Sequence, residues 1–243
     1  MLTLGPAACG ASPKALKMGE MEIPPMSVCI LLPTFNEAGS IGDLIDRVRA
    51  VDKKFRIIIA DGGSDDGTME IARGRGAEII AFNKRGKARA VKDAFSKIEN
   101  ESVVLLDSDK SYLPEDIPRL LKALSGCDVV AGSRFAGDIE PGSMTALNRF
   151  GNKALTFMAN ALYGKKITDI CSGFWAFRKS AYKSIDIDSK HFELEANFYV
   201  FCAKKKLVLR EVPISYRTRE GKTKLSPIHG IDIGWYLLAK RFS

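Results

Sequence analysis

From residue 27 onward the chain alternates short apolar runs with longer stretches in which apolar residues recur every three or four positions. The apolar runs are rich in Val, Ile and Leu, which is typical of strands buried on both faces of a parallel sheet. They cover residues 27–33, 55–61, 77–82, 103–106 and 127–133. The stretches between them have the period of an amphipathic helix and cover residues 40–51, 67–76, 86–98 and 114–126. This alternation predicts an α/β fold with a doubly wound, mostly parallel sheet and helices on both faces.

Polar clusters directly follow three of the predicted strands. The first strand leads into PTFNE (33–37), the second into DGGSDDGT (61–68) and the fourth into DSD (107–109). The carboxyl ends of parallel strands meet at one edge of a sheet, and ligands of such sheets bind there. We therefore expect these three clusters to form one site.

Two aspartates, Asp107 and Asp109, stand one residue apart at the end of the fourth predicted strand. Neighbouring carboxylates repel each other and are costly to desolvate unless a cation neutralises them. An extended segment places both side chains on the same side, which suits Mg²⁺ or Mn²⁺ shared with a diphosphate. A helix-capping aspartate beside a solvated one is the alternative interpretation.

The glycine-rich segment after the second strand has two interpretations. Asp61 precedes Gly62 and Gly63, and its carboxylate could meet a nucleotide base or ribose in the tight turn that they form. Asp-Gly stretches are also ordinary turns that need no ligand. Asp66 is expected to cap the helix that starts near Gly67.

Several kinds of site are excluded by what the sequence lacks. It contains no phosphate-binding loop of the form GxxxxGK[ST] and no glycine fingerprint placed after a strand. Two histidines are too few for a histidine-based metal site or catalytic triad, and the five cysteines, which form no CxxC pair, are predicted to be free thiols. No pattern of base-stacking aromatic residues interleaved with Lys and Arg on a sheet face is seen, so nucleic acid is not an expected partner.

The net positive charge of the chain comes from its second half. The net charge is +8, and residues 140–243 alone carry 18 Lys and Arg against 9 Asp and Glu. This asymmetry indicates that the second half meets an anion or an anionic surface.

The motifs taken together resemble glycosyltransferase family 2 with its GT-A fold, and within it the dolichyl-phosphate sugar synthases. The similarity is greatest to archaeal enzymes that load the first sugar of an N-glycan onto dolichyl phosphate. It spans roughly residues 27 to 240 and rests on the following segments, in this order: LLPTFNE, ADGGSDDGT, GKARAV, LLDSDKSYLPEDIPRLL, VVAGSRF, NRFGNKALTFMANALYG, TDICSGFWAFRKSAY, FELEANF and EVPISYRTREGKTKL.

This resemblance implies a set of donor-side residues. The positions that match the family's nucleotide-sugar site are Pro33, Phe35, Glu37, Ile59, Asp61 and Ser108, together with Arg219 and Lys224 of a loop that folds over the nucleotide phosphates. The resemblance places the metal on Asp107, Asp109 and Ser111. Mannose synthases of this group usually carry Gln where this chain has Ser111, a shorter and weaker ligand, so a UDP-sugar is favoured over GDP-mannose.

On the acceptor side, Arg134 and Arg149 match the family's arginines for the lipid phosphate. Guanidinium groups suit phosphate geometry and remain charged. Because a phosphate monoester is already anionic, the reaction needs no strong general base, and direct attack inverts the anomeric carbon. Asp169 is expected to orient other groups, and Glu193 and Glu195 are expected to brace basic residues.

Two stretches, 144–163 and 231–242, have the pattern of amphipathic helices that either lie in a membrane interface or pack on the protein core. No apolar run approaches the about 20 residues that a spanning helix needs. We expect peripheral attachment to the cytoplasmic face of a membrane, or a membrane-anchored partner. Residues 1–26 lack the features of a signal peptide and are expected to be a loosely ordered tail. The catalytic domain is expected at 27–243. Residues 27–139 would form its nucleotide-sugar half and residues 140–243 its acceptor half.

The predicted function is therefore transfer of a hexosyl residue from a nucleoside-diphosphate sugar to dolichyl or another polyprenyl phosphate, early in protein N-glycosylation. Two alternatives remain open at this point. The same fold could act on a soluble phosphorylated acceptor, or the chain could be a non-catalytic protein that binds anions or membranes. Intact Asp107 and Asp109 argue against the non-catalytic reading.

Overall fold

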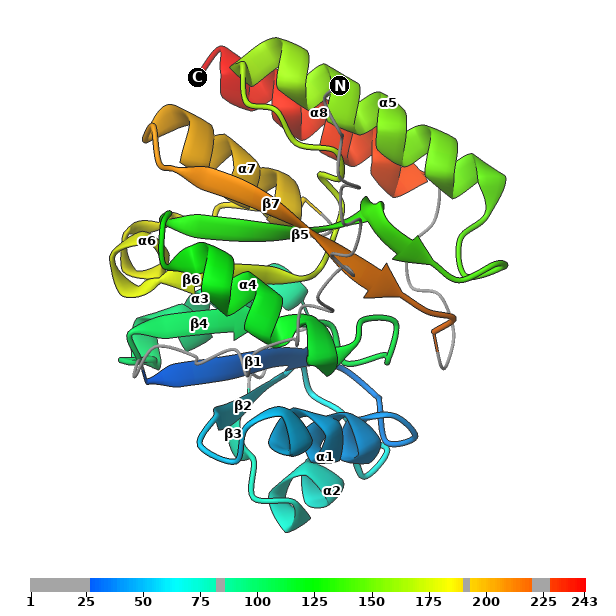
Figure 1. Cartoon of the computed structure of the whole chain (residues 1–243), viewed down its shortest axis with the longest axis vertical. Helices are drawn as coiled ribbons and strands as arrows, with labels where there is room; N and C mark the ends of the chain where they lie inside the picture. Colours follow the sequence, from blue (N-terminus) through cyan, green and yellow to red (C-terminus); the bar gives the residue numbers. More distant parts are fainter. Residues whose placement is uncertain (1–26, 82–85, 190–192, 220–227) are drawn as a thin grey trace, which may run out of the picture.

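The computed structural model describes residues 27–81, 86–189, 193–219 and 228–243, whose strands form one seven-stranded sheet in the order β3-β2-β1-β4-β6-β5-β7 (Figure 1). The predicted tail at 1–26 lies outside these residues. The four cysteines that the structure describes are free thiols, as expected.

The first half of the sheet is parallel and follows the predicted alternation closely. Its strands are β1 (Val28–Thr34), β2 (Arg56–Asp61), β3 (Glu78–Ala81) and β4 (Ser102–Leu105). The helices that connect them are α1 (Ile41–Val51), α2 (Thr68–Gly74) and α3 (Lys87–Lys97). β1 pairs with both β2 and β4 in parallel register, so the polar clusters after these strands meet at one edge.

The second half adds strands that the sequence pattern did not predict. The fifth predicted strand is β5 (Val129–Ile139), which pairs in parallel with the unpredicted β7 (Leu209–Tyr216). Between β4 and β5 lies β6 (Trp175–Arg178), antiparallel to both. Since an antiparallel strand begins where its parallel neighbours end, the segment that leads into β6 arrives at the same edge as the polar clusters.

The remaining helices cover both faces of this mixed, mostly parallel sheet. They are a 3₁₀ turn (Pro114–Asp116) that leads into α4 (Ile117–Leu124), and then α5 (Ala146–Tyr163), α6 (Lys179–Ser184), α7 (Leu194–Lys204) and α8 (Ile228–Arg241). The predicted doubly wound α/β architecture is confirmed.

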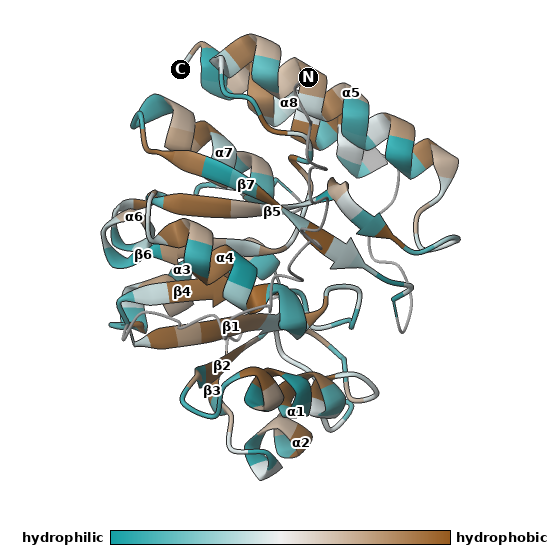
Figure 2. Cartoon of the chain, viewed as in Figure 1, coloured by the Kyte–Doolittle hydropathy of each residue, from teal (hydrophilic) through white to brown (hydrophobic). Residues whose placement is uncertain are grey.

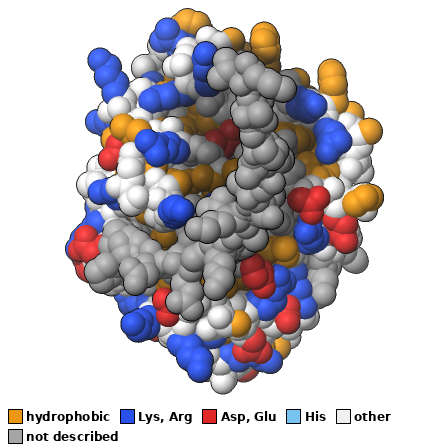
Figure 3. Space-filling model, viewed as in Figure 1, with side chains coloured by type: hydrophobic (Ala, Val, Ile, Leu, Met, Phe, Trp, Pro, Cys, Tyr) orange, Lys and Arg blue, Asp and Glu red, His pale blue; other side chains and the backbone are white. Residues whose placement is uncertain are grey.

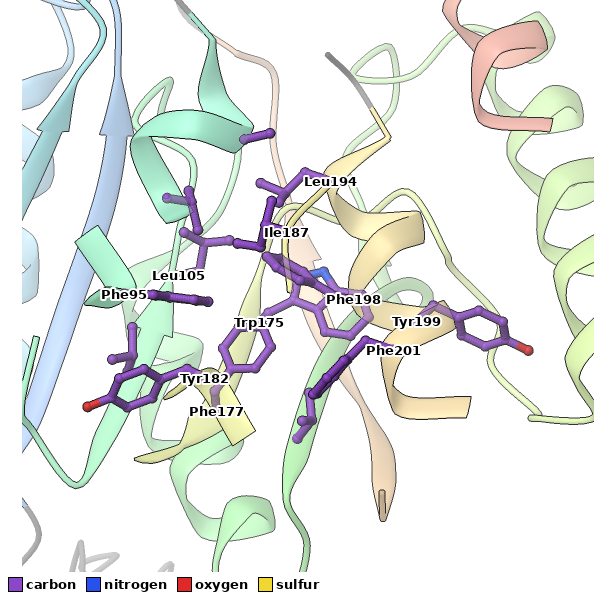
Figure 4. Packing of buried hydrophobic residues seen from close by; sticks show 14 of the residues in the cluster. Phe95, Leu105, Trp175, Phe177, Tyr182, Ile187, Leu194, Phe198, Tyr199 and Phe201 are labelled. Carbon is purple, nitrogen blue, oxygen red and sulfur yellow. The ribbon is translucent and has the colours of Figure 1, made fainter. Parts of the chain in front are cut away.

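Alternating strand residues divide the core into two layers. Cys29 and Leu31 of β1 face the layer that contains α3 and α7, whereas Ile30 and Leu32 face the layer that contains α1 and α4. Figure 2 shows the strands between these layers as largely hydrophobic. In the first layer aromatic rings pack edge to face, with the centroids of Phe177 and Phe198 4.9 Å apart (Figure 4). This arrangement ties α7 firmly to the sheet.

α5 and α8 lie side by side at one end of the molecule and contact each other and α7 (Figure 1). Their outward side chains form what we name the apolar face: Leu147, Phe150, Phe157, Ile231, Trp235, Leu238 and Phe242. Phe150 is 73% exposed and Trp235 is 72% exposed, so neither packs in the core. Figure 3 shows apolar side chains projecting among Lys and Arg at this end. The prediction of amphipathic C-terminal helices is confirmed.

A polar network fixes the rotation of α8, and hence the direction in which its apolar residues point. The hydroxyl of Tyr236 donates to Asp188 at 2.7 Å, and Asn197 Nδ2 donates to the same hydroxyl at 2.6 Å. Lys240 forms an ion pair with Asp188, and Tyr163 donates to the backbone oxygen of Leu237 at 2.8 Å. Within the described part of the chain, no helix is both long and apolar enough to cross a membrane.

Candidate active site

A cavity of about 530 Å³ opens at the carboxyl ends of the parallel strands and extends to the first turns of α5 and α8. Its lining includes the charged residues Asp107, Asp109 and Arg134 and the apolar residues Leu147, Leu155 and Ile233. One cavity therefore contains both ionised groups and apolar side chains.

The two aspartates of the DSD segment are each paired with a cation. Asp107 Oδ1 lies 2.6 Å from Lys87 Nζ. The buried carboxylate of Asp109 accepts hydrogen bonds from the backbone N and the Oγ of Ser111, at 3.0 and 2.5 Å, and forms an ion pair with Arg219. These partners offset the repulsion and desolvation that the spacing of the two acids imposes.

The same atoms fit the predicted divalent ion. Carboxylate oxygens of Asp107 and Asp109 and the hydroxyl of Ser111 are hard donors of the kind that Mg²⁺ and Mn²⁺ take, usually with substrate phosphates completing the shell. Lys87 and Arg219 already pair with these carboxylates, so a metal ion would share the two acids with them. Ser111 both holds Asp109 in place and offers an oxygen beside it.

Lys87, at the start of α3, is a site residue that the sequence reasoning missed. Its ammonium lies between Asp107 and Glu195, with Nζ 2.7 Å from Glu195 Oε1. Burial acts to lower the pKa of Lys87, but the two carboxylates outweigh burial and raise it. Burial raises the pKa of Glu195 despite the opposing effect of Lys87. The contact with Lys87 agrees with the expectation that Glu195 braces a basic residue. The GKARAV motif was the sequence feature that could have pointed to Lys87.

Arg134, at the cavity wall, is held by Asp169. Arg134 Nε donates to Asp169 Oδ2 at 2.6 Å and Nη2 donates to Oδ1 at 2.7 Å, while the backbone N of Arg134 also donates to Oδ2 at 3.0 Å. The ring of Tyr216 lies against the guanidinium, 5.1 Å from Cζ to the centroid. Asp169 therefore orients Arg134, and the remaining nitrogen, Nη1, is the one that Asp169 does not hold.

Tyr112 and Gly173 were also missed, and both shape the wall beside Asp107. The hydroxyl of Tyr112 accepts a hydrogen bond from the backbone N of Gly173 at 2.7 Å. A Cβ built at Gly173 would overlap the carboxylate of Asp107. Only glycine allows the chain entering β6 to pass so close to this aspartate. The glycine in the CSGFW segment was the sequence feature that could have indicated this close approach.

Some of the other residues predicted to bind the sugar donor line the cavity, and others do not. Pro33, Phe35, Glu37 and Ser108 line the cavity, and Ser108 Oγ donates to the backbone oxygen of Pro33 at 2.9 Å, joining the ends of β4 and β1.

Ile59 is fully buried among core residues on the α1 face. Asp61 accepts from Gly63 N at 2.9 Å and from Ser64 Oγ at 2.5 Å, which is the turn-stabilising geometry. Asp66 accepts from Thr68 N at 3.1 Å, beside the start of α2.

Arg219 contacts Asp109, as described above, whereas Lys224 lies outside the described residues. Arg149 is exposed on α5. Its neighbours Asn148 and Asn152 line the cavity, whereas Arg149 itself is not among the lining residues. The roles of Arg149 and Lys224 stay predictions.

Two proteins of Haloferax volcanii are similar in sequence to this chain. It is 38% identical over 222 residues to Glycosyltransferase AglJ of Haloferax volcanii, covering 89% of this chain and 72% of that protein. It is 35% identical to a dolichyl-phosphate hexose transferase of the same organism, covering 84% of this chain and 88% of that protein.

Among solved structures, glucosyl-3-phosphoglycerate synthase from Mycobacterium tuberculosis in complex with Mn²⁺, UDP-glucose and phosphoglyceric acid superposes with a TM-score of 0.74. The match covers 94% of this chain and 85% of that one at 19% identity, and it shows a shared fold. The family model for Glycosyl transferase family 2 matches residues 29–186. The chain belongs to glycosyl transferase family 2 and has the GT-A fold that its sequence motifs predicted.

Proposed function

We propose that the protein transfers a hexosyl residue from a UDP-linked sugar to dolichyl or another polyprenyl phosphate, with inversion, in an early step of protein N-glycosylation. Two observations support this substrate class. A relative that is 35% identical over 205 residues carries the name dolichyl-phosphate hexose transferase, and the cavity is lined by both charged and apolar side chains.

The continuity of the cavity with the apolar face carries the proposal. Leu147 lines the cavity and is 62% exposed on the apolar face, so one side chain belongs to both surfaces. Leu155 and Ile233 line the interior beside it. A polyprenyl phosphate needs such a path, because its phosphate must reach the ionised groups while its chain stays among apolar ones. A soluble phosphorylated acceptor needs no apolar exit.

At the donor end, Asp107, Asp109 and Ser111 would hold Mg²⁺ or Mn²⁺ together with the diphosphate. When bound, the ion would offset negative charge on the departing diphosphate. Arg219 already lies against Asp109 and is placed to contact the same phosphates. Lys87 keeps Asp107 oriented toward the cavity through their ion pair.

At the acceptor end, Nη1 of Arg134 would contact the phosphate, and Arg149 of α5 would supply a second guanidinium. An oxygen of the phosphate attacks the anomeric carbon, and the bond from that carbon to the diphosphate oxygen breaks. No proton has to be removed, since the monoester is already anionic. Positioning and charge stabilisation supply the catalysis.

The apolar face supports peripheral attachment to the cytoplasmic surface of a membrane. No Asp or Glu occurs between residues 141 and 168, a stretch that contains Arg149, Lys153, Lys165 and Lys166. Cations beside exposed aromatic and aliphatic side chains are typical of helices that lie in an anionic interface. A membrane-anchored partner that covers the same face is the second arrangement that these observations support.

Incubation with radiolabelled nucleotide sugars, dolichyl phosphate and Mn²⁺, followed by extraction with organic solvent, tests the proposal. Label from a UDP-sugar should enter the organic phase, and an Asp109→Ala protein should transfer none. Label that enters only phosphoglycerate or another soluble phosphate would favour a soluble acceptor, such as the one bound in the M. tuberculosis structure.

A further inference from the structure

Glu211 of β7 makes a set of contacts that the reaction described above does not use. Its Oε2 accepts from Thr168 Oγ1 at 2.8 Å, and its Oε1 accepts from the backbone N of Thr168 at 2.9 Å and of Asp169 at 3.0 Å. Three hydrogen-bond donors of the short turn at Thr168 and Asp169 thus bind the single carboxylate of Glu211.

That turn is the one that orients Arg134. Every hydrogen bond between Asp169 and Arg134 depends on where the backbone of Asp169 stands, because both side chains are buried and neither can reach far. Thr168 Oγ1 also lies 2.6 Å from Ser133 Oγ, next to Arg134 on β5. Glu211 therefore connects to the guanidinium through Thr168 and Asp169, over two successive sets of hydrogen bonds.

The carboxylates of Glu211 and Asp169 lie close enough to repel each other, which disfavours the ionised form of Glu211. Burial is the largest cause that raises the pKa of Glu211, and the nearby Asp169 raises it further. The donors of Thr168 and Asp169 oppose both effects. The second acid therefore carries an electrostatic penalty at this position, which its hydrogen bonds from Thr168 and Asp169 offset in part.

We propose that Glu211 is a positioning residue for the acceptor phosphate. It fixes the turn at Thr168 and Asp169, and that turn fixes the direction in which Nη1 of Arg134 points. Loss of Glu211 lets the turn shift, rotates the guanidinium and weakens the grip on the acceptor phosphate while the donor site is unaffected. The proposal rests on the proposed role of Arg134 in binding that phosphate.

The side chain of Gln offers a sharp comparison. In Glu211→Gln the oxygen can still accept from both backbone amides, and the amide nitrogen can donate to Thr168 Oγ1. In Glu211→Ala all of these contacts are lost. We expect Glu211→Ala to raise the KM for dolichyl phosphate by about tenfold with the KM for the nucleotide sugar within twofold of the unsubstituted protein. Glu211→Gln should keep both values within about twofold.

Arg210→Gln is the matched control, since Arg210 is the exposed neighbour of Glu211 on the same strand. It should change neither KM. Equal changes in both KM values in Glu211→Ala, an unchanged KM for dolichyl phosphate, or a Gln variant as impaired as the Ala variant would overturn the proposal.

A second readout does not depend on transfer. In ¹⁵N spectra, the Nε–H of Arg134, assigned with Arg134→Lys, should exchange slowly in the unsubstituted protein and in Glu211→Gln. It should exchange at least tenfold faster in Glu211→Ala. Equal exchange in all three proteins would overturn the positioning role even if lipid phosphate proved not to be the acceptor.

Should Glu211→Ala fail to fold, Thr168→Val removes only the hydroxyl and is expected to shift both readouts in the same direction by a smaller factor. An unsubstituted protein that transfers nothing to dolichyl phosphate would refute the proposed function and leave the exchange test of Glu211 standing.

Discussion

Lys87 Nζ lies 2.6 Å from Asp107 Oδ1, so the first acid of the DSD segment is paired with a cation from the start of α3. Glu195 accepts from the same ammonium on its other side. One lysine therefore pairs with carboxylates from two different parts of the chain at the wall of the cavity.

Replacing Lys87 by Met should leave the partly exposed carboxylate of Asp107 and the largely buried carboxylate of Glu195 without their shared cation. We expect a loss of unfolding free energy of about 2 kcal/mol, below the value for a fully buried pair because both side chains retain some exposure. Adding Glu195→Gln should recover part of this loss, since one of the two repelling charges is gone. Urea unfolding of the single and double variants measures the coupling, and strictly additive effects would contradict a shared charge cluster.

Asp109→Ala should abolish transfer and metal-dependent binding of UDP while the protein remains folded. The change removes the carboxylate that Ser111 and Arg219 hold. Asp93→Ala, an exposed acid on α3, is the control and should retain both activities. Titration calorimetry with UDP in the presence and absence of Mn²⁺ measures the effect. Normal turnover by Asp109→Ala would show that the metal binds elsewhere.

Gly173→Ala should lower kcat by about 100-fold or more, because the added methyl group displaces the carboxylate of Asp107. Gly74→Ala is the matched control: it adds the same methyl group at the end of α2 where nothing lies within 4 Å. That control should gain up to about 1 kcal/mol of stability. A Gly173→Ala protein with full activity would mean that Asp107 can move without consequence.

Trp235→Ser with Leu238→Ser should weaken sedimentation with vesicles that contain anionic lipid. These side chains are 72% and 38% exposed, so the double variant should keep its Tm within about two degrees. Leu237→Ser changes the fully buried neighbour and should lower the Tm while vesicle binding of the folded protein persists. Binding by the unsubstituted protein should fall as salt rises. Undiminished binding by the double variant would remove α8 from the membrane contact.

The ionisation of Asp188 should make the stability of the folded protein depend on pH. Burial acts to raise its pKa, but hydrogen bonds from Lys240 and Tyr236 outweigh burial and lower it. The stabilisation is thus present above the unfolded pKa of about 3.9 and is lost as pH falls through the lower folded value.

Asp188→Asn should reduce stability by about 1 kcal/mol near neutral pH. The difference from the unsubstituted protein should shrink as pH falls below about 4 and disappear only below the lowered pKa of Asp188 in the folded protein. Asp186→Asn, whose side chain is 82% exposed, is the control and should show little difference at any pH. A constant gap between Asp188→Asn and the unsubstituted protein across this range would contradict the role of Asp188.

The parallel half of the fold was predictable because each strand and helix there carries its own period. α7 was missed because almost all of its residues are buried, including Glu195 and Asn197, so no polar stripe marks it. β6 is four residues long, too short for a period to be seen. The antiparallel placement of β6 between β4 and β5 depends on contacts between distant segments.

The site was predictable where adjacent residues carry the chemistry, as in Asp107 and Asp109. It was not predictable where partners come from separate elements. Lys87 acquires its role only when α3 and α7 pack together, and Glu211 only when β7 joins β5. Asp61 shows the converse: its position is the predicted one, yet its carboxylate is engaged by its own turn.

The most direct test of the acceptor is a comparison of kcat/KM for one UDP-sugar with two phosphates, dolichyl phosphate in vesicles and phosphoglycerate in solution. Because the cavity leads from Arg134 to the apolar face past Leu147, transfer to dolichyl phosphate should exceed transfer to phosphoglycerate by at least about 100-fold. Equal or greater transfer to phosphoglycerate would contradict the assignment of a polyprenyl phosphate as the acceptor.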